Sequence, residues 1–301
     1  MLNGRLVKTV TSDGFELQGF WIDRGGETAV FHSHGTSGDF YTHKFIDEIG
    51  RRVSEVGVSF LTANNRGHDV YAYLRRYVDG KVRWVQVGGA FERFEDCIFD
   101  IGGWLDFLEG QGVRKVILQG HSLCQKLLYY QSLKSDRRVV GQIYLSPGSD
   151  ASYMYYSLGA EKYREANSMV KRMVEEGRGE EMLPKELAIV CPMAALAYYG
   201  YLSEEGAGNL FPYHDPESPR WEALSKVEEP MLIVFGGADK FIKPSVDVAA
   251  RLFREKGGGS KVEVRVIEGG NHSFVGSEGE LAEIVVEWLD RNFLKVAQTS
   301  L

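Results

Sequence analysis

The sequence predicts an α/β fold with a mostly parallel central sheet, flanking helices and a helical insertion. Short apolar runs recur along the chain without the alternation of a half-exposed strand, which is typical of strands covered on both faces. Between these runs, apolar residues repeat at steps of three and four, as in helices that pack on a sheet. This alternation of strand and helix patterns indicates parallel strands joined by right-handed crossovers.

The predicted elements begin with a β-hairpin. The alternating segments Leu6–Val10 and Phe15–Ile22 flank a turn at Asp13 and Gly14, a pattern typical of paired strands. Helical stripes lie within residues 94–108, 248–253 and 281–289. The predicted buried strands are Thr28–Phe31, Val58–Thr62, Lys115–Leu118, Gln142–Leu145, Met231–Phe235 and Val262–Ile267.

The alternation stops between residues 151 and 225, where the patterns are helical. Glu161–Arg178 is helical and charged, Leu187–Tyr201 is helical and apolar, and the prolines of residues 211–216 indicate a rigid loop. An insertion between two strands is expected to cover the carboxyl edge of the sheet, where open α/β sheets bind ligands. We therefore predict a core of residues 1–150 and 226–301, with a helical cap of residues 151–225.

Length and charge exclude several classes of protein. The chain has 301 residues, 44% of them hydrophobic, which excludes a disordered polymer and a minidomain that needs disulfides or metals. Acidic residues outnumber basic ones by 42 to 35, giving a net charge of −7, and such a surface repels nucleic acid and anionic lipid. No apolar run reaches the roughly 18 residues of a membrane span. We expect neither nucleic acid nor membrane as a partner, and the sequence makes no prediction of the oligomeric state.

Cysteine usage suggests a reducing compartment. Cys97, Cys124 and Cys191 are odd in number and far apart, which is typical of reduced thiols. The residues from Met1 to Leu6 lack the charged and then apolar pattern of a signal peptide. We therefore expect a cytoplasmic protein.

A predicted strand, a tight turn and a predicted helix surround Ser122. The strand leads directly into Gly120-His121-Ser122-Leu123-Cys124, the context of a nucleophile elbow that exposes a strained serine above the sheet edge. The residues two before and two after the serine crowd each other, so both must be small; Gly120 meets this demand, and Cys124 makes the turn tighter. The alternative is a serine that caps a helix, and Cys124 is interpreted as a packed thiol rather than a nucleophile.

A serine nucleophile needs a base and an orienting carboxylate. Asp239 follows one predicted strand through two glycines, and His272 follows the next strand in the same way. This gives the chain order serine, acid, histidine that the fold requires. Asp150, which follows another strand, is an alternative acid; Asp239 has the alternative of a surface pair with Lys240, and His272 that of an ordinary loop histidine.

Two backbone N–H groups are expected to form an oxyanion hole. One is Leu123, next to the serine, and the other is Thr36, where His34-Gly35 turns the chain after a strand. His34 is interpreted as a brace of this loop, with a catalytic base as the alternative. Arg66 is likewise interpreted as a brace, with a substrate ligand as the alternative. The remaining histidines lack metal-ligand spacing and are interpreted as structural or solvated: His32, His43, His68, His121 and His214.

Tyrosines concentrate in the predicted cap, which holds eight of the fifteen. Tyrosine suits a half-wet surface, so we expect some of them to line a pocket for a mid-sized apolar or aromatic group. The alternative is that these rings pack the small core of the cap itself. The predicted substrate contacts are Tyr153, Tyr156, Tyr199 and Phe211.

These motifs resemble the α/β-hydrolase superfamily over nearly the whole chain. His34-Gly35 resembles its oxyanion motif, Asn65-Arg66-Gly67-His68 the loop after its next strand, and Gly120-His121-Ser122 its elbow. Asp239 and His272 resemble its acid and base. A weaker likeness, in His34-Gly35-Thr36 and Ser122-Leu123-Cys124-Gln125, points to a subgroup that includes siderophore-ester hydrolases, in which a glycine stands before the cysteine.

The resemblance implies a carboxylic-ester hydrolase with an acyl-enzyme on Ser122. His272 would take the serine proton, Asp239 would hold the imidazole, and the amides of Thr36 and Leu123 would bind the oxyanion. The resemblance implies a small-molecule ester as substrate and neither a metal nor an organic cofactor. The same residues would suit a thioesterase, an amidase, a C–C hydrolase or an acyltransferase. A non-catalytic ligand-binding protein of this fold, with an elbow impaired by Cys124, is a further alternative.

Overall fold

An eight-stranded sheet forms the centre of the molecule in a computed structural model that describes residues 3–188, 191–258 and 261–294. The strand order is β1-β2-β4-β3-β7-β8-β9-β10. β2 is antiparallel to both of its neighbours, and the other pairs are parallel. The bounds are β1 Arg5–Val10, β2 Glu16–Ile22, β3 Thr28–Ser33, β4 Ser59–Ala63, β7 Lys115–His121, β8 Val139–Leu145, β9 Met231–Gly236 and β10 Val262–Ile267.

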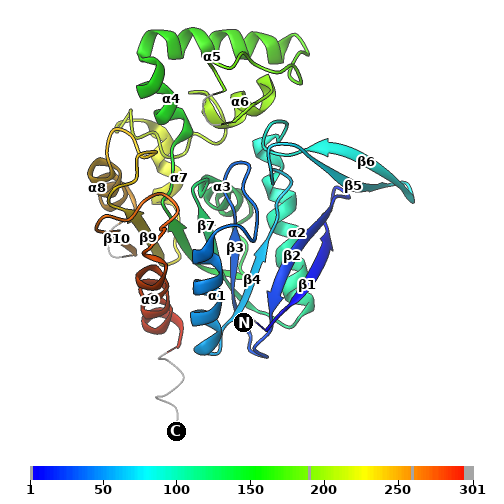
Figure 1. The fold of residues 1–301 in the computed structure, drawn as a ribbon, viewed down its shortest axis with the longest axis vertical. Helices are drawn as coiled ribbons and strands as arrows, with labels where there is room; N and C mark the ends of the chain where they lie inside the picture. The colour runs from blue at the N-terminus through cyan, green and yellow to red at the C-terminus, as the bar shows by residue number, and fades with distance from the viewer. Residues whose placement is uncertain (1–2, 189–190, 259–260, 295–301) are drawn as a thin grey trace.

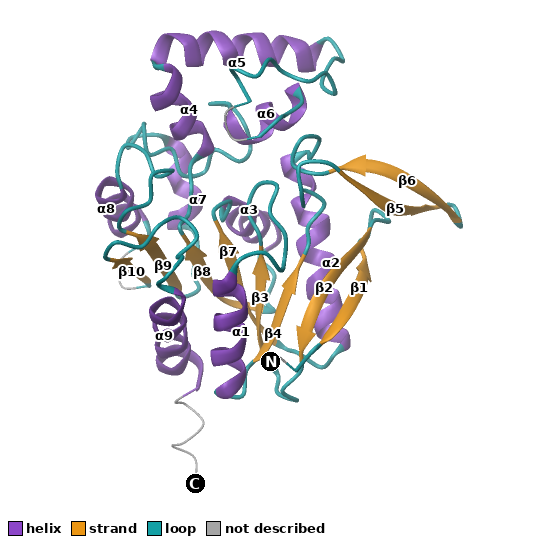
Figure 2. Cartoon of the chain, viewed as in Figure 1, coloured by secondary structure: helices purple, strands orange, loops and turns teal. Residues whose placement is uncertain are grey.

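Helices cover both faces of this sheet (Figures 1 and 2). On one face α1 and α9 pack together over a cluster that includes Val30, Ile117 and Val234. On the other face α2, α3 and α8 bury a second cluster that includes Phe31, Leu118 and Phe235. The bounds are α1 Lys44–Glu55, α2 Cys97–Gly110, α3 Gln125–Lys134, α8 Val246–Lys256 and α9 Glu278–Leu289.

Successive residues of the central strands therefore point to opposite cores, and the predicted α/β fold with its parallel sheet is confirmed. The predicted hairpin and the six other predicted strands are all present, with ends that differ by a few residues. Five of the six are largely buried as predicted, but β10 lies at the edge of the sheet and only its last residue, Ile267, is fully buried. Phe94–Asp96 and Pro219–Trp221 are 3₁₀-helices, and Asp290–Leu294 is a single π-helical turn. No helix of the described residues is long and apolar enough to cross a membrane.

Three helices between β8 and β9 lie beyond the carboxyl edge of the sheet (Figure 1). These inserted helices are α4 Asp150–Leu158, α5 Ala160–Glu175 and α6 Ala195–Leu202, and the short α7 Glu222–Ser225 follows them. They share a small core of their own that includes Tyr163, Tyr198 and Tyr201 and that also contacts Leu123. Several tyrosines of this segment therefore pack its own core. The domain boundaries at residues 150 and 226 stay a prediction.

One local expectation was wrong, and one element was not predicted. The predicted helix Leu187–Tyr201 begins only at Ala195, because Pro192 lacks the N–H group that a helix interior needs; residues 189 and 190 lie outside the described residues. A second sheet, the hairpin of β5 Ala72–Val78 and β6 Lys81–Val87, was not predicted. It projects beside the inserted helices (Figure 2).

Candidate active site

Ser122 occupies a strained turn between β7 and α3. Its φ of 63° lies in the left-handed region, which costs a residue other than glycine about 1–3 kcal/mol. The turn is held from both sides: Ser122 N–H donates to Leu145 O at 2.9 Å, and Ser122 O accepts from Cys124 N–H at 2.9 Å and Gly148 N–H at 2.7 Å. Strain maintained by its surroundings is typical of a functional position.

The small residues around Ser122 are tightly packed. A Cβ on Gly120 would lie 3.0 Å from Leu127 Cδ1 and 3.3 Å from Cys124 Cα. Cys124 fits into this space and is fully buried, with its Sγ 3.8 Å from Leu145 O. Burial raises the pKa of the Cys124 thiol, which keeps it protonated and unreactive. The structure therefore accommodates cysteine at this position.

The loops after β9 and β10 bring Asp239 and His272 to Ser122. His272 Nε2 lies 3.0 Å from Ser122 Oγ, and His272 Nδ1 lies 2.6 Å from Asp239 Oδ2. With its proton on Nδ1, the ring donates to Asp239 and accepts from the serine hydroxyl. The side chain of Asp239 is completely buried, and its Oδ1 accepts from Phe241 N–H at 2.9 Å. The carboxylate is therefore fixed in the orientation that the imidazole needs.

Glycine allows these two loops to approach each other. A Cβ on Gly236 would lie 2.5 Å from the carbonyl oxygens of both Gly270 and Asn271. Ala238 N–H donates to Gly270 O at 2.8 Å, which ties the two loops together. The glycine pairs that precede Asp239 and His272 in the sequence thus serve the close contact between neighbouring strand ends.

His121 supports the loop of His272, a contribution that the sequence analysis missed. His121 Nε2 lies 2.8 Å from His272 O, and the two rings are 5.0 Å apart. Burial lowers the pKa of His121 well below its usual range, so the neutral ring donates Nε2–H to this carbonyl. The histidine between Gly120 and Ser122 was the available signal, because it follows the strand that carries the serine.

The loop after β3 packs directly against the serine turn. A Cβ on Gly35 would lie 2.7 Å from Ser122 Cβ and 3.3 Å from Leu123 N, so only glycine fits there. His34 donates Nδ1–H to Gly35 O at 2.8 Å and accepts Asn65 N–H at Nε2 at 3.1 Å. This bonding is that of a brace. Among the described residues, neither Leu123 N–H nor Thr36 N–H has a hydrogen-bond acceptor, so both are free to bind an oxyanion.

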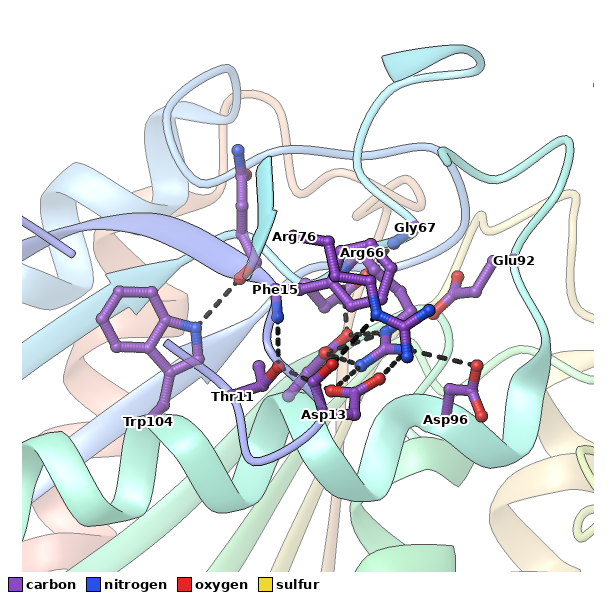
Figure 3. A network of polar contacts seen from close by, with 12 residues as sticks. Thr11, Asp13, Phe15, Arg66, Gly67, Arg76, Glu92, Asp96 and Trp104 are labelled. Carbon is purple, nitrogen blue, oxygen red and sulfur yellow. Dashed lines mark hydrogen bonds and ion pairs between the residues drawn. The ribbon is translucent and has the colours of Figure 1, made fainter. Parts of the chain in front are cut away.

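Arg66 is a buried brace at the centre of a network of polar contacts (Figure 3). Its side chain is 4% exposed and forms ion pairs with three carboxylates, those of Asp13, Asp96 and Asp100, at 2.8–3.1 Å. Its own backbone N–H also donates to Asp100 at 2.8 Å. The cluster ties the first hairpin and α2 to the loop after β4.

The predicted substrate contacts differ in their positions. The ring of Tyr153 lies 5.8 Å from that of Phe241, which in turn lies 5.0 Å from the His272 ring. Tyr156 is 44% exposed. Tyr199 donates to Glu205 in a surface pocket beside α5. Phe211 is fully buried in the main core, because its apolar ring packs with Trp221 and Phe253. Of the four, only Tyr153 is joined to the site by ring contacts among the described residues, and Phe211 packs within the main core.

Asp150 is not the acid that orients His272. Its Oδ2 accepts from the Thr36 hydroxyl at 3.3 Å, whereas Asp239 holds the imidazole. Burial raises the pKa of Asp150 to about 6, although the Thr36 hydroxyl opposes this shift. In the described part of the chain, no group of three or more His, Cys, Asp or Glu side chains has the arrangement of a metal site.

Comparison with known proteins gives a family for this chain. Residues 98–294 match the family described as a protein of unknown function, DUF1749. The chain belongs to this family. The comparison with curated proteins gives no match.

Solved structures show the fold of this DUF1749 protein. The α/β hydrolase GrgF from Penicillium sp. sh18 is similar with a TM-score of 0.67 and 14% identity, over 97% of this chain and 99% of its own. The siderophore hydrolase EstB from Aspergillus fumigatus gives 0.65 and 17% over 97% and 98%. The esterase Pf2001 from Pyrococcus furiosus gives 0.61 and 15% over 96% and 93%. The protein therefore has the α/β-hydrolase fold, and the predicted resemblance is confirmed.

Proposed function

We propose that this protein is a serine hydrolase that cleaves carboxylic esters of a small to mid-sized substrate. The observation that carries the proposal is the continuous contact from Ser122 Oγ through His272 to Asp239, with distances of 3.0 and 2.6 Å. Such a relay turns a weak hydroxyl nucleophile into a reactive one. The esterases and hydrolases among its structural neighbours share this fold and support the proposal.

In the first half of the proposed reaction, Ser122 Oγ attacks the ester carbonyl carbon while His272 Nε2 accepts the hydroxyl proton. Asp239 stabilises the imidazolium that results. The N–H groups of Thr36 and Leu123 bind the negative oxygen of the tetrahedral intermediate, and removing one such donor typically costs about 3–4 kcal/mol of transition-state stabilisation. His272 then protonates the leaving alkoxide, and the acyl group stays on Ser122.

In the second half, water attacks the acyl carbon and gives its proton to His272. The new tetrahedral intermediate uses the same two N–H groups. When it collapses, the carboxylic acid leaves and Ser122 Oγ takes back the proton from His272. No group besides these residues and water is required. The inserted helices serve in this proposal as the cap of residues 151–225 that limits access to Ser122.

A fluorophosphonate probe tests this function directly. We expect Ser122 Oγ to displace fluoride and to carry a phosphonyl adduct that mass spectrometry locates. The Ser122→Ala variant is expected to remain unlabelled. Ser146→Ala is the matched control, because Ser146 ends the neighbouring strand with a φ of 42° but has no hydrogen bond of its hydroxyl within the described residues. An unlabelled wild-type protein would favour the non-catalytic alternative.

A panel of substrates tests the kind of bond. Nitrophenyl esters of increasing acyl length should be hydrolysed faster than the matching anilides, since the stronger amide bond has a poorer leaving group. Thioesters of the same acids form the third arm. If anilides or thioesters react faster than the esters at equal acyl length, the assignment to ester bonds is wrong while the serine mechanism remains.

The proposal extends to the setting of the enzyme. We propose a cytoplasmic location, supported by the buried, unpaired thiols of Cys97, Cys124 and Cys191. The net charge of −7 supports a small-molecule substrate rather than nucleic acid.

A further inference from the structure

The carboxyl group of Asp150, at the start of α4, lies close to the proposed reaction centre. Gly148, two residues before it, packs against Ser122, because a Cβ on Gly148 would lie 3.7 Å from Ser122 Oγ. Among the described residues, no Lys, Arg or His side chain forms an ion pair with Asp150, and its only side-chain hydrogen bond there comes from Thr36 at 3.3 Å. The charges of His272 and Lys126 also act on Asp150. His272 is the proposed catalytic base, and the Lys126 ammonium is held by Glu92 at 2.6 Å.

Two aromatic rings lie between the helix of Asp150 and His272. Tyr153 follows Asp150 by three residues on α4, and residues at this spacing share one face of a helix. The Tyr153 ring lies 5.8 Å from Phe241, and the Phe241 ring lies 5.0 Å from His272. Phe241 is 52% exposed, an unusual exposure for an apolar ring beside a proposed catalytic base. The Phe241 ring therefore lies next to His272, the Tyr153 ring of α4 lies next to Phe241, and the charge of Asp150, on the same helix as Tyr153, interacts with His272.

We infer that Asp150, Tyr153 and Phe241 bind a cationic group, a protonated amine or a quaternary ammonium, in the alcohol portion of the substrate. The inference rests on the proposed esterase function and names the substrate class. A cation is attracted both by a carboxylate and by aromatic faces, whereas an anionic substrate is repelled by Asp150. The cation belongs to the alcohol because His272 protonates the leaving oxygen, so the alcohol lies beside this ring and its neighbour Phe241.

The ionisation of Asp150 agrees with this role. Burial raises the pKa of its carboxyl group to about 6, so the group is ionised at pH 8. A bound cation stabilises the carboxylate and lowers this pKa, against the effect of burial. A neutral ester gives no such stabilisation, so preference for a cationic ester should increase as the pH rises through about 6. The ratio of rates for two esters isolates this effect, because proton transfer through His272 is common to both.

The test compares butyrylcholine with its uncharged isostere, 3,3-dimethylbutyl butyrate, at pH 8. We expect kcat/KM of the wild type to be about 10- to 100-fold higher for the choline ester, the range of a hydrogen bond or contact to a charged group. Asp150→Asn should reduce the ratio to about 3- to 10-fold, the share that the remaining aromatic rings contribute. Phe241→Leu should reduce it about 3- to 10-fold, since one ring face is lost. Asp247→Asn, an exposed carboxyl in the first turn of α8, is the matched control and should keep the wild-type ratio.

A second readout does not depend on turnover. Choline and 3,3-dimethylbutanol are compared as competitors that protect Ser122 from the fluorophosphonate, and choline should protect at a lower concentration. Equal protection by the two alcohols, or a ratio of ester rates that Asp150→Asn leaves unchanged, overturns the inference while the esterase proposal stands. Absence of fluorophosphonate labelling and of hydrolysis of either ester overturns both.

Discussion

Two buried polar clusters of this protein differ in how completely other protein groups surround their polar atoms. In the Arg66 cluster, made by Arg66, Asp13, Asp96 and Asp100, the guanidinium is surrounded by carboxylates and its side chain is 4% exposed. In the Ser122 cluster, made by Ser122, His272 and Asp239, the carboxylate end is fully buried but the imidazole is 18% exposed. The first arrangement holds segments together, and the second leaves a reactive end for a substrate.

The comparison shows why charge burial alone does not identify an active site. Arg66 is the more conspicuous group, since it joins three carboxylates in the interior (Figure 3). Its donors, however, are used by protein acceptors, which leaves little capacity for a ligand. Ser122 has a modest set of bonds, but it combines a strained φ of 63° with a base at 3.0 Å. An open, strained and polar arrangement is the better indicator of chemistry.

The largest expected effect comes from removing the reactive end of the Ser122 cluster. Ser122→Ala should lower kcat for a nitrophenyl ester more than a thousandfold, since only binding and oxyanion stabilisation remain. Thermal unfolding should change by only a few degrees, because one partly exposed hydroxyl is removed. Ser146→Ala serves as the control and should keep its activity. Hydrolysis at the wild-type rate in Ser122→Ala would remove Ser122 as the nucleophile.

Breaking the Arg66 cluster should lower the stability of the protein. Arg66→Met leaves Asp100, which is fully buried, without its cation, and the loss of one partner of a buried ion pair costs about 3–5 kcal/mol of unfolding free energy. Arg138 also contacts three carboxylates, but its side chain is 23% exposed, so Arg138→Met should cost about 1 kcal/mol or less. Urea unfolding of both variants measures the difference. Equal losses of unfolding free energy in the two variants would contradict the distinction between the buried ion pairs of Arg66 and the partly exposed ion pairs of Arg138.

The sequence predicted the Ser122 cluster better than the surroundings of the substrate. Ser122, Asp239 and His272 each follow an apolar strand through small residues, and the parallel sheet places those strand ends at one edge. The order and spacing of the motifs therefore carried this information. The sequence left Asp239 and Asp150 as alternative acids, because both follow strands; only the loop conformations distinguish them.

Aromatic residues outside strands were harder to place. Tyr153 and Phe211 lie in the same inserted region and are equally aromatic, yet one contacts the Phe241 ring beside His272 and the other is buried against Phe253. Their positions depend on packing between distant elements, which a local pattern does not contain. The hairpin β5–β6 is a different case, because Asp79 and Gly80, with φ of 51° and 71°, form a turn that the sequence signals directly.

A smaller effect on kcat is expected when a methyl group is added where the loop after β3 packs against the Ser122 turn. Gly35→Ala would place a methyl group 2.7 Å from Ser122 Cβ and 2.8 Å from His121 O, so the loop that carries Thr36 N–H must move. We expect kcat to fall about 10- to 100-fold, somewhat less than for complete loss of one oxyanion donor. Gly279→Ala, where no atom lies within 4 Å of the added Cβ and φ lies outside the left-handed region, controls for changes at a surface glycine. Unchanged kcat in Gly35→Ala would separate this loop from the oxyanion hole.

Acid should act on buried His32 and on the Arg66 cluster in different pH ranges. His32 of β3 is fully buried, accepts Gln119 Nε2–H at 2.8 Å, and its ring lies 5.8 Å from that of Phe45. Burial lowers the pKa of His32 from 6.5 to about 3. Between these values the unfolded chain binds a proton at His32 that the native protein does not, so His32 alone lowers the stability by about 1.4 kcal/mol per pH unit as the pH decreases below 6.5. Burial also lowers the pKa of His34 and His121, which act in the same direction. In the Arg66 cluster the pKa of Asp13 is lowered from 3.8 despite burial, by hydrogen bonds and charge from Arg66, and its stabilisation is lost only as the pH falls below 3.8.

The difference between these ranges can be measured by urea unfolding at pH 6.5, 5.5 and 4.5. His32→Phe should reduce the slope of unfolding free energy against pH by about 1.4 kcal/mol per unit, because it removes the group that the unfolded chain protonates. Asp13→Asn should leave that slope unchanged over the same range, since Asp13 stays ionised in both states there. If His32→Phe and the wild type lose stability in parallel, the neutral His32 does not contribute to the acid sensitivity of the protein, and its distinction from the charged Arg66 cluster is lost.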